Sequence, residues 1–446
     1  MSLDETRTAT QSLHPIDAAP RPGVLLIDHP DPRFVGTARI IEAGESVVLG
    51  RGSEALIPGV FVDSRISRRH ATLTSRGNTL TLTDHDSRNG TLVGGVPVES
   101  CQLSDGDIIT LGPVLLMVRW MKTDRVVPPR GGLVGISAAL AEALALVDRV
   151  ARRPVTVLVV GEPGVGKELI AQELHRRSAR PGALVAVNSA GIADGVLSSE
   201  LFGHTRGAFS GATGPRSGLV ESARGGTLFL DEIGDASPLM QASLLRLLQQ
   251  REYRPVGADR AIKADIRFVA ATNRRMVEAV SAGEFRSDLY SRLSRCVIQL
   301  PPLRERPEDI LPLARHFATR FAQRPVGLSH SLALVLLRHD WPGNVRGLEG
   351  IIERIALENE DCAALPEPPW LADALSLQGG PAAVAPPAAP KSTGRPSAEA
   401  LAAVLRRHSG NVSSVAAELG VGRNTLYRWM RGYALSLASF RDVDSR

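Results

Sequence analysis

Cysteine and long apolar runs are scarce in this sequence, and both shortages exclude classes of protein. The three cysteines, Cys101, Cys296 and Cys362, are far apart and have no CxxC or histidine spacing around them. A disulfide framework and a zinc site are therefore not expected. No run of about 18 apolar residues occurs, and residues 1–15 lack the basic-then-apolar pattern of a secretory signal. We therefore expect a cytoplasmic protein without a membrane span, whose three thiols are free and buried.

Charge is also sparse and unevenly placed. The whole chain carries +5, and residues 391–446 hold nine Lys or Arg against four Asp or Glu, so this segment alone accounts for the excess. A basic C-terminal segment on a neutral body favours a nucleic-acid-binding tail, although an ordinary solvated surface gives a similar excess.

The length and patterning predict several domains. A chain of 446 residues suggests about three domains at roughly 100–200 residues each. Short alternating apolar runs separated by turn residues indicate a β-sandwich, and helices alternating with apolar strands indicate a parallel α/β fold. In order, we expect a disordered lead-in over 1–20, a β-sandwich over 21–122, an α/β domain over 131–301, a helical lid over 302–365, a Pro/Ala-rich semi-rigid linker over 366–396 with eight prolines, and a small all-α module over 397–433.

A glycine-rich turn between a predicted strand and a predicted helix marks a phosphate site. The segment Gly161-Glu-Pro-Gly-Val-Gly-Lys167 follows the apolar run Val155–Val160. Its glycines let backbone N–H groups face phosphates, and the lysine reaches the β and γ oxygens. The residues expected to bind nucleotide here are Gly161, Glu162, Gly164, Val165, Gly166, Lys167 and Glu168. Taken alone, such a turn could be only a tight strand-to-helix connection.

Two carboxylates supply the second half of the nucleotide site. Asp231 and Glu232 follow the apolar run Thr227–Leu230, and ligands of open α/β sheets bind at the carboxyl ends of the strands. We assign Asp231 to Mg²⁺ and Glu232 to orienting and deprotonating the attacking water, with ATP as the nucleotide. A helix N-cap pair is the alternative, but the order of the two motifs disfavours it.

A segment between these two halves serves neither of them. It consists of Gly207, Ala208, Phe209, Ser210, Gly211 and Ala212. An aromatic residue flanked by Gly, Ala and Ser suits the tip of a mobile loop rather than a helix face or a buried strand. A partner other than nucleotide is expected to bind it.

Together with the preceding Glu200–Arg206, this segment resembles the loop by which bacterial enhancer-binding proteins, the AAA+ activators of sigma-54 RNA polymerase, push on the sigma factor. The Gly-Lys-Glu of the phosphate loop, ending at Glu168, also matches that family. The family's loop reads GAFTGA, so Ser210 keeps the hydroxyl and loses one methyl, which weakens an apolar contact by up to about 1 kcal/mol. Phe209 is then the main anchor on sigma-54.

The resemblance implies roles for further residues. Asn188 holds the catalytic glutamate in check, Asn273 reads the γ-phosphate, and Arg346 senses nucleotide from the lid, with Asn344 as N-cap of its helix. Arg286 and Arg292 resemble paired arginine fingers that complete a neighbour's site in a ring. Each arginine taken singly fits a surface salt bridge as well.

The lid departs from the family pattern at two positions. Gly347 and Gly350 stand inside the helix that carries Arg346, and each costs roughly 1 kcal/mol relative to alanine. A looser lid helix is expected.

The N-terminal sandwich carries arginine and serine at its predicted loop ends. Gly50-Arg51, Ser67-Arg68-Arg69-His70 and Ser87-Arg88-Asn89-Gly90-Thr91 resemble the forkhead-associated (FHA) domain, a phosphothreonine reader. Arg51, Ser67 and Arg68 would grip the phosphate, Asn89 the peptide backbone, and Arg88 would add charge. His70 is expected to be a structural buttress. A sandwich used only for packing is the alternative, and peptide selectivity stays open because Gly94 replaces the family's usual asparagine.

The residue pattern of the C-terminal module predicts a helix, a tight Gly turn and a second helix over residues 410–430. It resembles the Fis-type helix-turn-helix, whose second helix enters the major groove. The DNA-binding residues expected are Arg423, Asn424, Thr425, Tyr427 and Arg428. A helical hairpin for oligomerisation is the alternative.

These resemblances imply an ATP-hydrolysing transcription activator that binds upstream DNA, assembles from dimers into a hexameric ring and opens the sigma-54 promoter complex. Phosphothreonine recognition, with input from a Ser/Thr kinase, would gate it. A phosphopeptide-dependent scaffold or DNA-bound repressor, whose ATPase only controls assembly, is the main alternative, and a general AAA+ remodeller of other proteins is a third.

Overall fold

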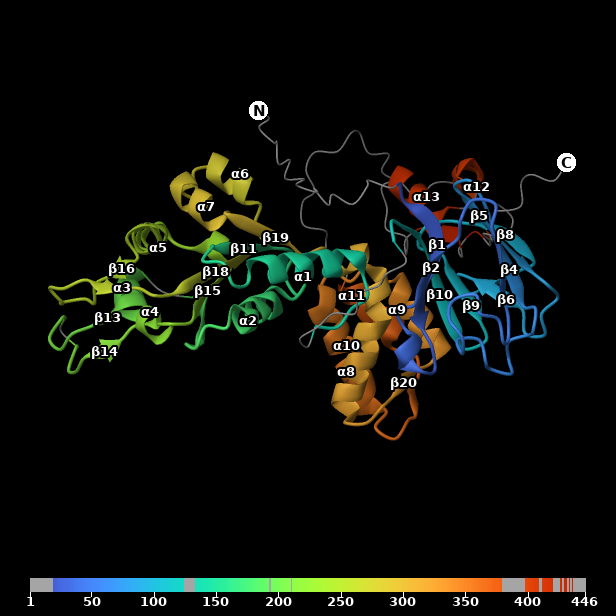
Figure 1. Cartoon of the computed structure of the whole chain (residues 1–446), viewed down its shortest axis with the longest axis horizontal. Coiled ribbons are helices and arrows are strands. Elements are labelled where there is room, and N and C mark those ends of the chain that lie inside the picture. The colour runs from blue at the N-terminus through green and yellow to red at the C-terminus, as the bar shows by residue number, and fades with distance from the viewer. Residues whose placement is uncertain are drawn as a thin grey trace, which may run out of the picture. The chain divides into compact units, whose positions relative to one another are not determined.

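A computed structural model gives the fold (Figure 1). It describes residues 19–123, 133–191, 194–209, 211–378, 398–408, 411–419, 426, 429–430, 433 and 435. Residues 1–18 of the expected lead-in, residues 379–396 of the expected linker, Ser210 and the five expected DNA-binding residues therefore lie outside the described residues. The β-sandwich and the α/β part belong to separate compact units. Across the described ranges, no helix is long and apolar enough to span a bilayer.

The N-terminal part is the expected β-sandwich of antiparallel strands. One sheet has the order β2 (Ala38–Ile40), β1 (Arg21–Asp28), β10 (Val114–Met121), β9 (Ile108–Leu111), β6 (Thr91–Val93), β7 (Val96–Val98), and the other the order β3 (Ser46–Leu49), β4 (Ala71–Arg76), β5 (Thr79–Asp84), β8 (Ser100–Leu103). Alternate residues such as Leu80 and Leu82 are fully buried, as a strand with one face on the core requires. A short 3-10 turn, η1 (Pro32–Phe34), follows β1.

The α/β part is built on a five-stranded parallel sheet, as expected. Its order is β12 (Leu184–Asn188), β15 (Thr227–Asp231), β18 (Arg267–Thr272), β11 (Val157–Val160), β19 (Cys296–Gln299). Compared with the apolar run Val155–Val160, β11 starts two residues later. All five strands point their carboxyl ends to one edge, where the motifs follow.

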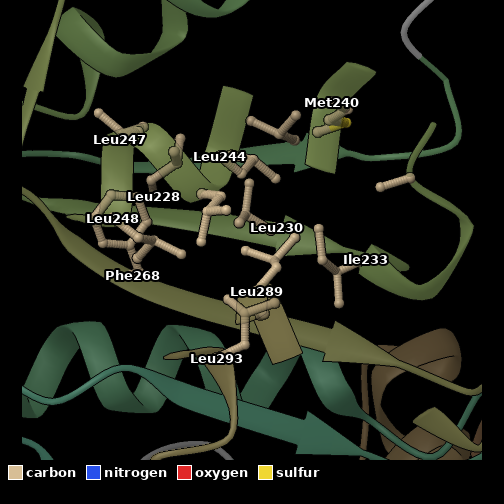
Figure 2. Close-up of a cluster of buried hydrophobic side chains, with 14 of the residues drawn as sticks. Leu228, Leu230, Ile233, Met240, Leu244, Leu247, Leu248, Phe268, Leu289 and Leu293 are labelled. Atoms are coloured by element: carbon tan, nitrogen blue, oxygen red, sulfur yellow. The ribbon is translucent and has the colours of Figure 1, made fainter. Parts of the chain in front are cut away.

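Helices cover both faces of this sheet, so its strands are apolar on both sides. Val157 and Val159 of β11 pack with α1 (Ala138–Val150) and α2 (Lys167–Ser178). Leu158 points to the other face, where Leu228, Leu230 and Phe268 meet the leucines of α5 (Pro238–Gln250) and α7 (Ser287–Leu293) (Figure 2). This part also contains α3 (Asp194–Phe202), α4 (Leu219–Ser222), η2 (Ile233–Asp235) and α6 (Met276–Ser281), with the two-stranded pairs β13 (Gly203–His204) with β14 (Arg216–Ser217) and β16 (Glu252–Tyr253) with β17 (Ile262–Lys263).

The lid is mostly helical, as expected, with one small correction. It contains η3 (Leu303–Glu305), η4 (Pro307–Asp309), α8 (Ile310–Ala322), α9 (His330–Arg338) and α10 (Asn344–Glu358). A two-residue parallel pair, β20 (Gly327–Leu328) with β21 (Ala364–Leu365), also forms. The helix α10 runs unbroken through Gly347 and Gly350.

The stretch from which we expected a linker begins with a helix, α11 (Leu371–Gln378). Leu371 and Leu375 are buried, and a ring nitrogen of His339 lies 3.1 Å from the carbonyl oxygen of Leu375. The expectation of a linker is therefore wrong for this part, because apolar side chains at helical spacing outweigh the nearby prolines.

The C-terminal module contains α12 (Ala398–Arg407) and α13 (Val412–Glu418). Val415, Ala416 and Leu426 are buried together with Leu401, Ala402 and Leu405 of α12. None of the three cysteines, all of which lie in the described ranges, forms a disulfide. Cys101 is buried as expected, but Cys296 and Cys362 are only half-buried.

Candidate nucleotide site and partner-binding surfaces

The nucleotide motifs meet at the carboxyl edge of the parallel sheet. The phosphate loop follows β11. Asp231 ends β15 and Glu232 follows it, and Asn273 follows β18, which lies between β11 and β15. Gly164 and Gly166 have φ of 76° and 105°, which glycine adopts at little cost. The helix α2 begins at Lys167 without a side-chain cap, so its first N–H groups form a phosphate cradle.

Glu232 is held by both neighbouring motifs. Its Oε1 lies 3.0 Å from Nζ of Lys167, and its Oε2 accepts a hydrogen bond of 3.1 Å from the backbone N–H of Asn273. The glutamate backbone has a φ of 47°, a left-handed conformation that is uncommon for non-glycine residues and typical of functional sites. A phosphate that attracted the lysine would therefore also release one oxygen of the glutamate.

Asn188 lies one strand from this pair. It is in register with Asp231 across β12 and β15, and its carboxamide oxygen accepts a hydrogen bond of 3.0 Å from the N–H of Ala190. The structure thus brings Asn188, Asp231 and Glu232 to one edge, while the contacts that hold Glu232 come from Lys167 and Asn273. The restraining role of Asn188 stays a prediction.

The lid contacts the phosphate loop through its backbone. The N–H groups of Val345 and Arg346 donate to the carbonyl oxygen of Gly164 at 3.0 and 3.3 Å. A Cβ on Gly164 would come within 2.5 Å of the carbonyl oxygen of Gly343. This approach explains why glycine is required at that position.

Asn344 does not cap α10 through its side chain, which corrects our expectation. Gly343 occupies the cap position, and the fully buried Asn344 side chain faces the phosphate loop instead. Its Nδ2 donates to Oε2 of Glu162 at 3.1 Å and to the Pro163 carbonyl at 3.0 Å, while its Oδ1 accepts from the Leu303 N–H at 2.8 Å. Because its backbone has a φ of 52°, asparagine suits the position for conformational reasons as well.

Glu162 ties the phosphate loop to the base of the lid. Both of its oxygens accept hydrogen bonds from Arg304, at 2.8 and 2.5 Å. These bonds, helped by Asn344 and opposed by burial, lower the pKa of Glu162. The pair is 39–40% exposed, so its contribution to stability is screened by solvent.

A buried pair of charged residues, Arg306 and Asp309, was not predicted from the sequence. Arg306 donates to the carbonyl oxygen of Val165 at 2.9 Å, and its Nη1 lies 3.6 Å from Asp309. Asp309 accepts from the N–H groups of Ile136 and Ser137 at 2.5 and 2.8 Å and from Oγ of Ser137 at 2.7 Å. Burial raises the pKa of Asp309 and lowers that of Arg306. The sequence feature that could have indicated these residues is the charged run Arg304–Asp309, which lies shortly after β19, the last strand of the parallel sheet.

Two of the three expected arginines, Arg286 and Arg292, lie at opposite ends of α7, and Arg346 lies on α10. Arg286 precedes α7 and forms an ion pair of 2.8 Å with Asp288, both half exposed. Arg292 lies in the last turn of α7 and is partly exposed, and Arg346 is exposed on the first turn of α10. Residues on the surface of one subunit are available to a neighbour, but their roles as arginine fingers and lid sensor stay predictions.

The loop between β13 and β14 presents an exposed aromatic ring. Phe209 is 49% exposed and its ring packs edge-on against that of His204, with centroids 4.9 Å apart. The N–H of Gly207 donates to the carbonyl oxygen of Ala212 at 2.8 Å, and this bond closes the loop. His204 is fixed in turn by a 2.8 Å hydrogen bond with Oγ of Ser199.

The expected phosphopeptide residues gather at one end of the sandwich. Arg51, Arg68 and Arg88 are exposed, and none has an ion pair within the described part of the chain. Oγ of Ser67 accepts from the N–H of Arg88 at 3.1 Å, and Nδ2 of Asn89 donates to the Arg65 carbonyl at 2.7 Å. Three cations around a hydroxyl fit a dianionic phosphate.

His70 buttresses this end, as expected. It is fully buried, and its two ring nitrogens lie 3.1 Å from the N–H of Ser67 and 3.1 Å from the carbonyl oxygen of Gly90. Asp84 supports the neighbouring loop by accepting from the N–H and Oγ of Ser87 and from Oγ1 of Thr91, at 2.8, 2.6 and 2.6 Å. Although burial acts in the opposite direction, these hydrogen bonds lower the pKa of Asp84.

Comparisons with known proteins agree with these motifs. Family models match as "Sigma-54 interaction domain" over residues 133–299, "FHA domain" over 47–112, "AAA+ ATPase lid domain" over 304–367 and "Bacterial regulatory protein, Fis family" over 397–433. The transcriptional regulatory protein ZraR of Klebsiella oxytoca is 45% identical over 303 residues, which are 66% of this chain and 67% of that protein. The chain belongs to the sigma-54-dependent transcriptional activators.

Other relatives match a shorter stretch of this activator or are less similar to it in sequence. The Nif-specific regulatory protein of Azospirillum brasilense is 49% identical over 240 residues, which are 53% of this chain but only 38% of that protein. A crystal structure of NtrX from Brucella abortus in complex with ADP is similar with a TM-score of 0.51 and 30% identity, covering 68% of this chain and 70% of that chain. The activator is therefore a nucleotide-binding AAA+ ATPase with an FHA domain and a Fis-type DNA-binding domain.

Proposed function

We propose that this activator uses ATP hydrolysis to remodel the closed complex of sigma-54 RNA polymerase into the open complex. The observation that carries the proposal is Phe209, an exposed ring on a loop separate from the nucleotide site. A large apolar side chain held in solvent by a neighbouring ring is typical of a contact with another protein.

The residues at the sheet edge fit a Mg²⁺-dependent ATPase. The Asp231 carboxylate has no ion pair within the described ranges, and Mg²⁺ in such sites takes one or two carboxylates together with phosphate oxygens. When bound, Mg²⁺ neutralises charge on the phosphates. Lys167 leaves Glu232 for the phosphates, so the freed carboxylate oxygen accepts a proton from the attacking water.

Asn273 connects the reading of the phosphate to Glu232. Its backbone N–H binds Glu232, and its side chain is the group we assign to reading the γ-phosphate. Loss of the γ-phosphate would therefore change the contact of Asn273 with the phosphate and its contact with Glu232 together. Arg286 and Arg292 of a neighbouring subunit would complete the site, which requires assembly into a ring, for which we propose a hexamer.

Control of this activity is proposed to come from the FHA domain. Arg51, Ser67, Arg68, Arg88 and Asn89 would bind a phosphothreonine made by a Ser/Thr kinase and gate the ATPase. Binding of a dimer to upstream DNA through Arg423, Asn424, Thr425, Tyr427 and Arg428 would place the ring near its promoter. A phosphothreonine peptide should lose most of its affinity in the Arg51→Ala variant. Arg69→Ala is the control, because Arg69 is exposed but is not among the residues expected to bind the peptide. This variant should bind the peptide as the wild type does.

The loop variant tests the proposal. Phe209→Ala should keep most ATPase activity and lose promoter opening, because it removes the contact with sigma-54 and leaves the nucleotide site intact. Leu239→Ala is the matched control, since Leu239 is exposed to a similar degree, 47%. Equal loss of ATPase and opening in Phe209→Ala would instead indicate a structural role for the loop.

A further inference from the structure

The α/β domain has a cavity at the edge of the sheet opposite the nucleotide motifs. Its volume is about 410 Å³, and it lies where β11 and β18 begin. Small-molecule sites commonly have volumes of about 300–1,000 Å³. The cavity is therefore large enough for a small ligand.

Arginine dominates the charge of this cavity. It is lined by Arg152, Arg153, Arg180, Arg251 and Arg267, and by one carboxylate, Asp265. Asp265 pairs with Arg180 at 2.6 Å. In the described part of the chain, Arg152 and Arg153 have no ion pair, and both are exposed. One negative charge thus faces five positive charges.

Backbone carbonyls hold the two inner guanidiniums in place without neutralising them. Arg251 donates to the carbonyl oxygen of Ile266 at 3.0 Å, and its guanidinium lies 5.2 Å from the centre of the Phe268 ring. Arg267 is 6% exposed and donates to the carbonyl oxygens of Val150 and Ala151, while its Nε is buried without a hydrogen-bond partner. Burial, followed by the charge of Arg180, lowers the pKa of both groups.

We propose that this cavity is a binding site for a small anion carrying two or more phosphate groups. Guanidinium groups bind phosphate oxygens in a bidentate manner and keep their charge when partly buried. Such a ligand would relieve the repulsion among the five arginines. The inference is independent of the proposed function, because the cavity lies at the opposite sheet edge from Lys167 and Glu232.

Calorimetry with inorganic tripolyphosphate tests the inference on the full-length chain. Saturating ADP first fills the phosphate loop, so that only other sites can bind the probe. We expect one tripolyphosphate per chain and a higher melting temperature of the α/β domain on binding. The double variant Arg152→Glu with Arg153→Glu should bind at least about tenfold more weakly, because it removes two charge-assisted contacts.

The control variant is Arg76→Glu with Arg246→Glu, which changes the net charge equally at exposed positions outside the cavity. It should bind tripolyphosphate as the wild type does. Arg180→Gln should weaken binding as the double variant does. The proposal is overturned if no one-to-one binding occurs beside ADP, if ADP competes with the probe, or if control and cavity variants bind it equally.

Discussion

Replacing Asn344 tests whether one buried carboxamide holds the lid on the phosphate loop. Asn344→Ala leaves the Leu303 N–H and the Pro163 carbonyl without their partner, at about 1–3 kcal/mol for each buried group. Alanine at a φ of 52° adds about 1–2 kcal/mol of backbone strain. We therefore expect a loss of about 3–8 kcal/mol in the stability of the lid contact, with weaker ADP binding.

Two further substitutions separate these causes. Asn344→Gly removes the same hydrogen bonds without the strain, so it should be about 1 kcal/mol more stable than the alanine variant. Asn344→Asp keeps an acceptor for Leu303 but sets a carboxylate against Glu162, so it should bind ADP more weakly at neutral pH than at pH 5.

The assays are hydrogen exchange of peptides from the phosphate loop and α10, and titration with fluorescent ADP. The exchange measurement is local, which matters in a chain of several domains. Unchanged exchange and unchanged ADP affinity in Asn344→Ala would refute the reasoning. A glycine variant less stable than the alanine variant would refute the strain argument alone.

Three other predictions concern the phosphate loop, the lid helix and the β-sandwich. Gly164→Ala should weaken ADP binding at least about tenfold by titration, because its Cβ would meet the lid backbone. Gly283→Ala is the control, since Gly283 has a similar φ of 74° with open space around it, and it should leave ADP affinity unchanged. Equal effects of the two substitutions would contradict the crowding argument. Gly350→Ala should raise the free energy of lid unfolding in urea by about 0.5–1 kcal/mol, because alanine favours the helix and its Cβ would face open space. A lower free energy of unfolding would reveal an unrecognised contact. Since hydrogen bonds lower the pKa of Asp84 below its ordinary 3.8, the stabilisation it gives is present above that value and is lost as the pH falls through the lower value in the folded protein. The protection factors of β5 amides, which compare each exchange rate with its intrinsic rate at the same pH, should therefore fall on acidification in the wild type. An equal fall in Asp84→Asn would be evidence against this origin.

The fold and the positions of the main motifs could be predicted because each depends on local patterning. Alternating apolar residues define the sandwich strands, and the strands of the α/β sheet end where their motifs begin. The sheet order then brings Lys167, Glu232 and Asn273 together, which needs no information beyond the order of the motifs and the fold.

Contacts between distant segments could not be predicted in this way. The sequence suggested a helix cap at Asn344, but the closeness of the phosphate loop, 182 residues away in sequence, gives the side chain other partners. Arg306 and Asp309 were missed because a charged run after a strand usually lies in solvent, whereas here both are buried against Val165 and Ser137. The helix α11 was missed because prolines on both sides of it outweighed two buried leucines in the sequence interpretation.

Promoter opening is the most direct test of the proposed activity. Purified sigma-54 RNA polymerase on a sigma-54 promoter would be combined with this activator and either ATP or a non-hydrolysable analogue. Each reaction would be run with and without a phosphothreonine peptide, and open complexes would be measured by permanganate reactivity. We predict opening with ATP and none with the analogue. ATP hydrolysis without opening, in the presence as well as the absence of the peptide, would contradict the proposal and favour a scaffold or repressor whose ATPase only controls assembly.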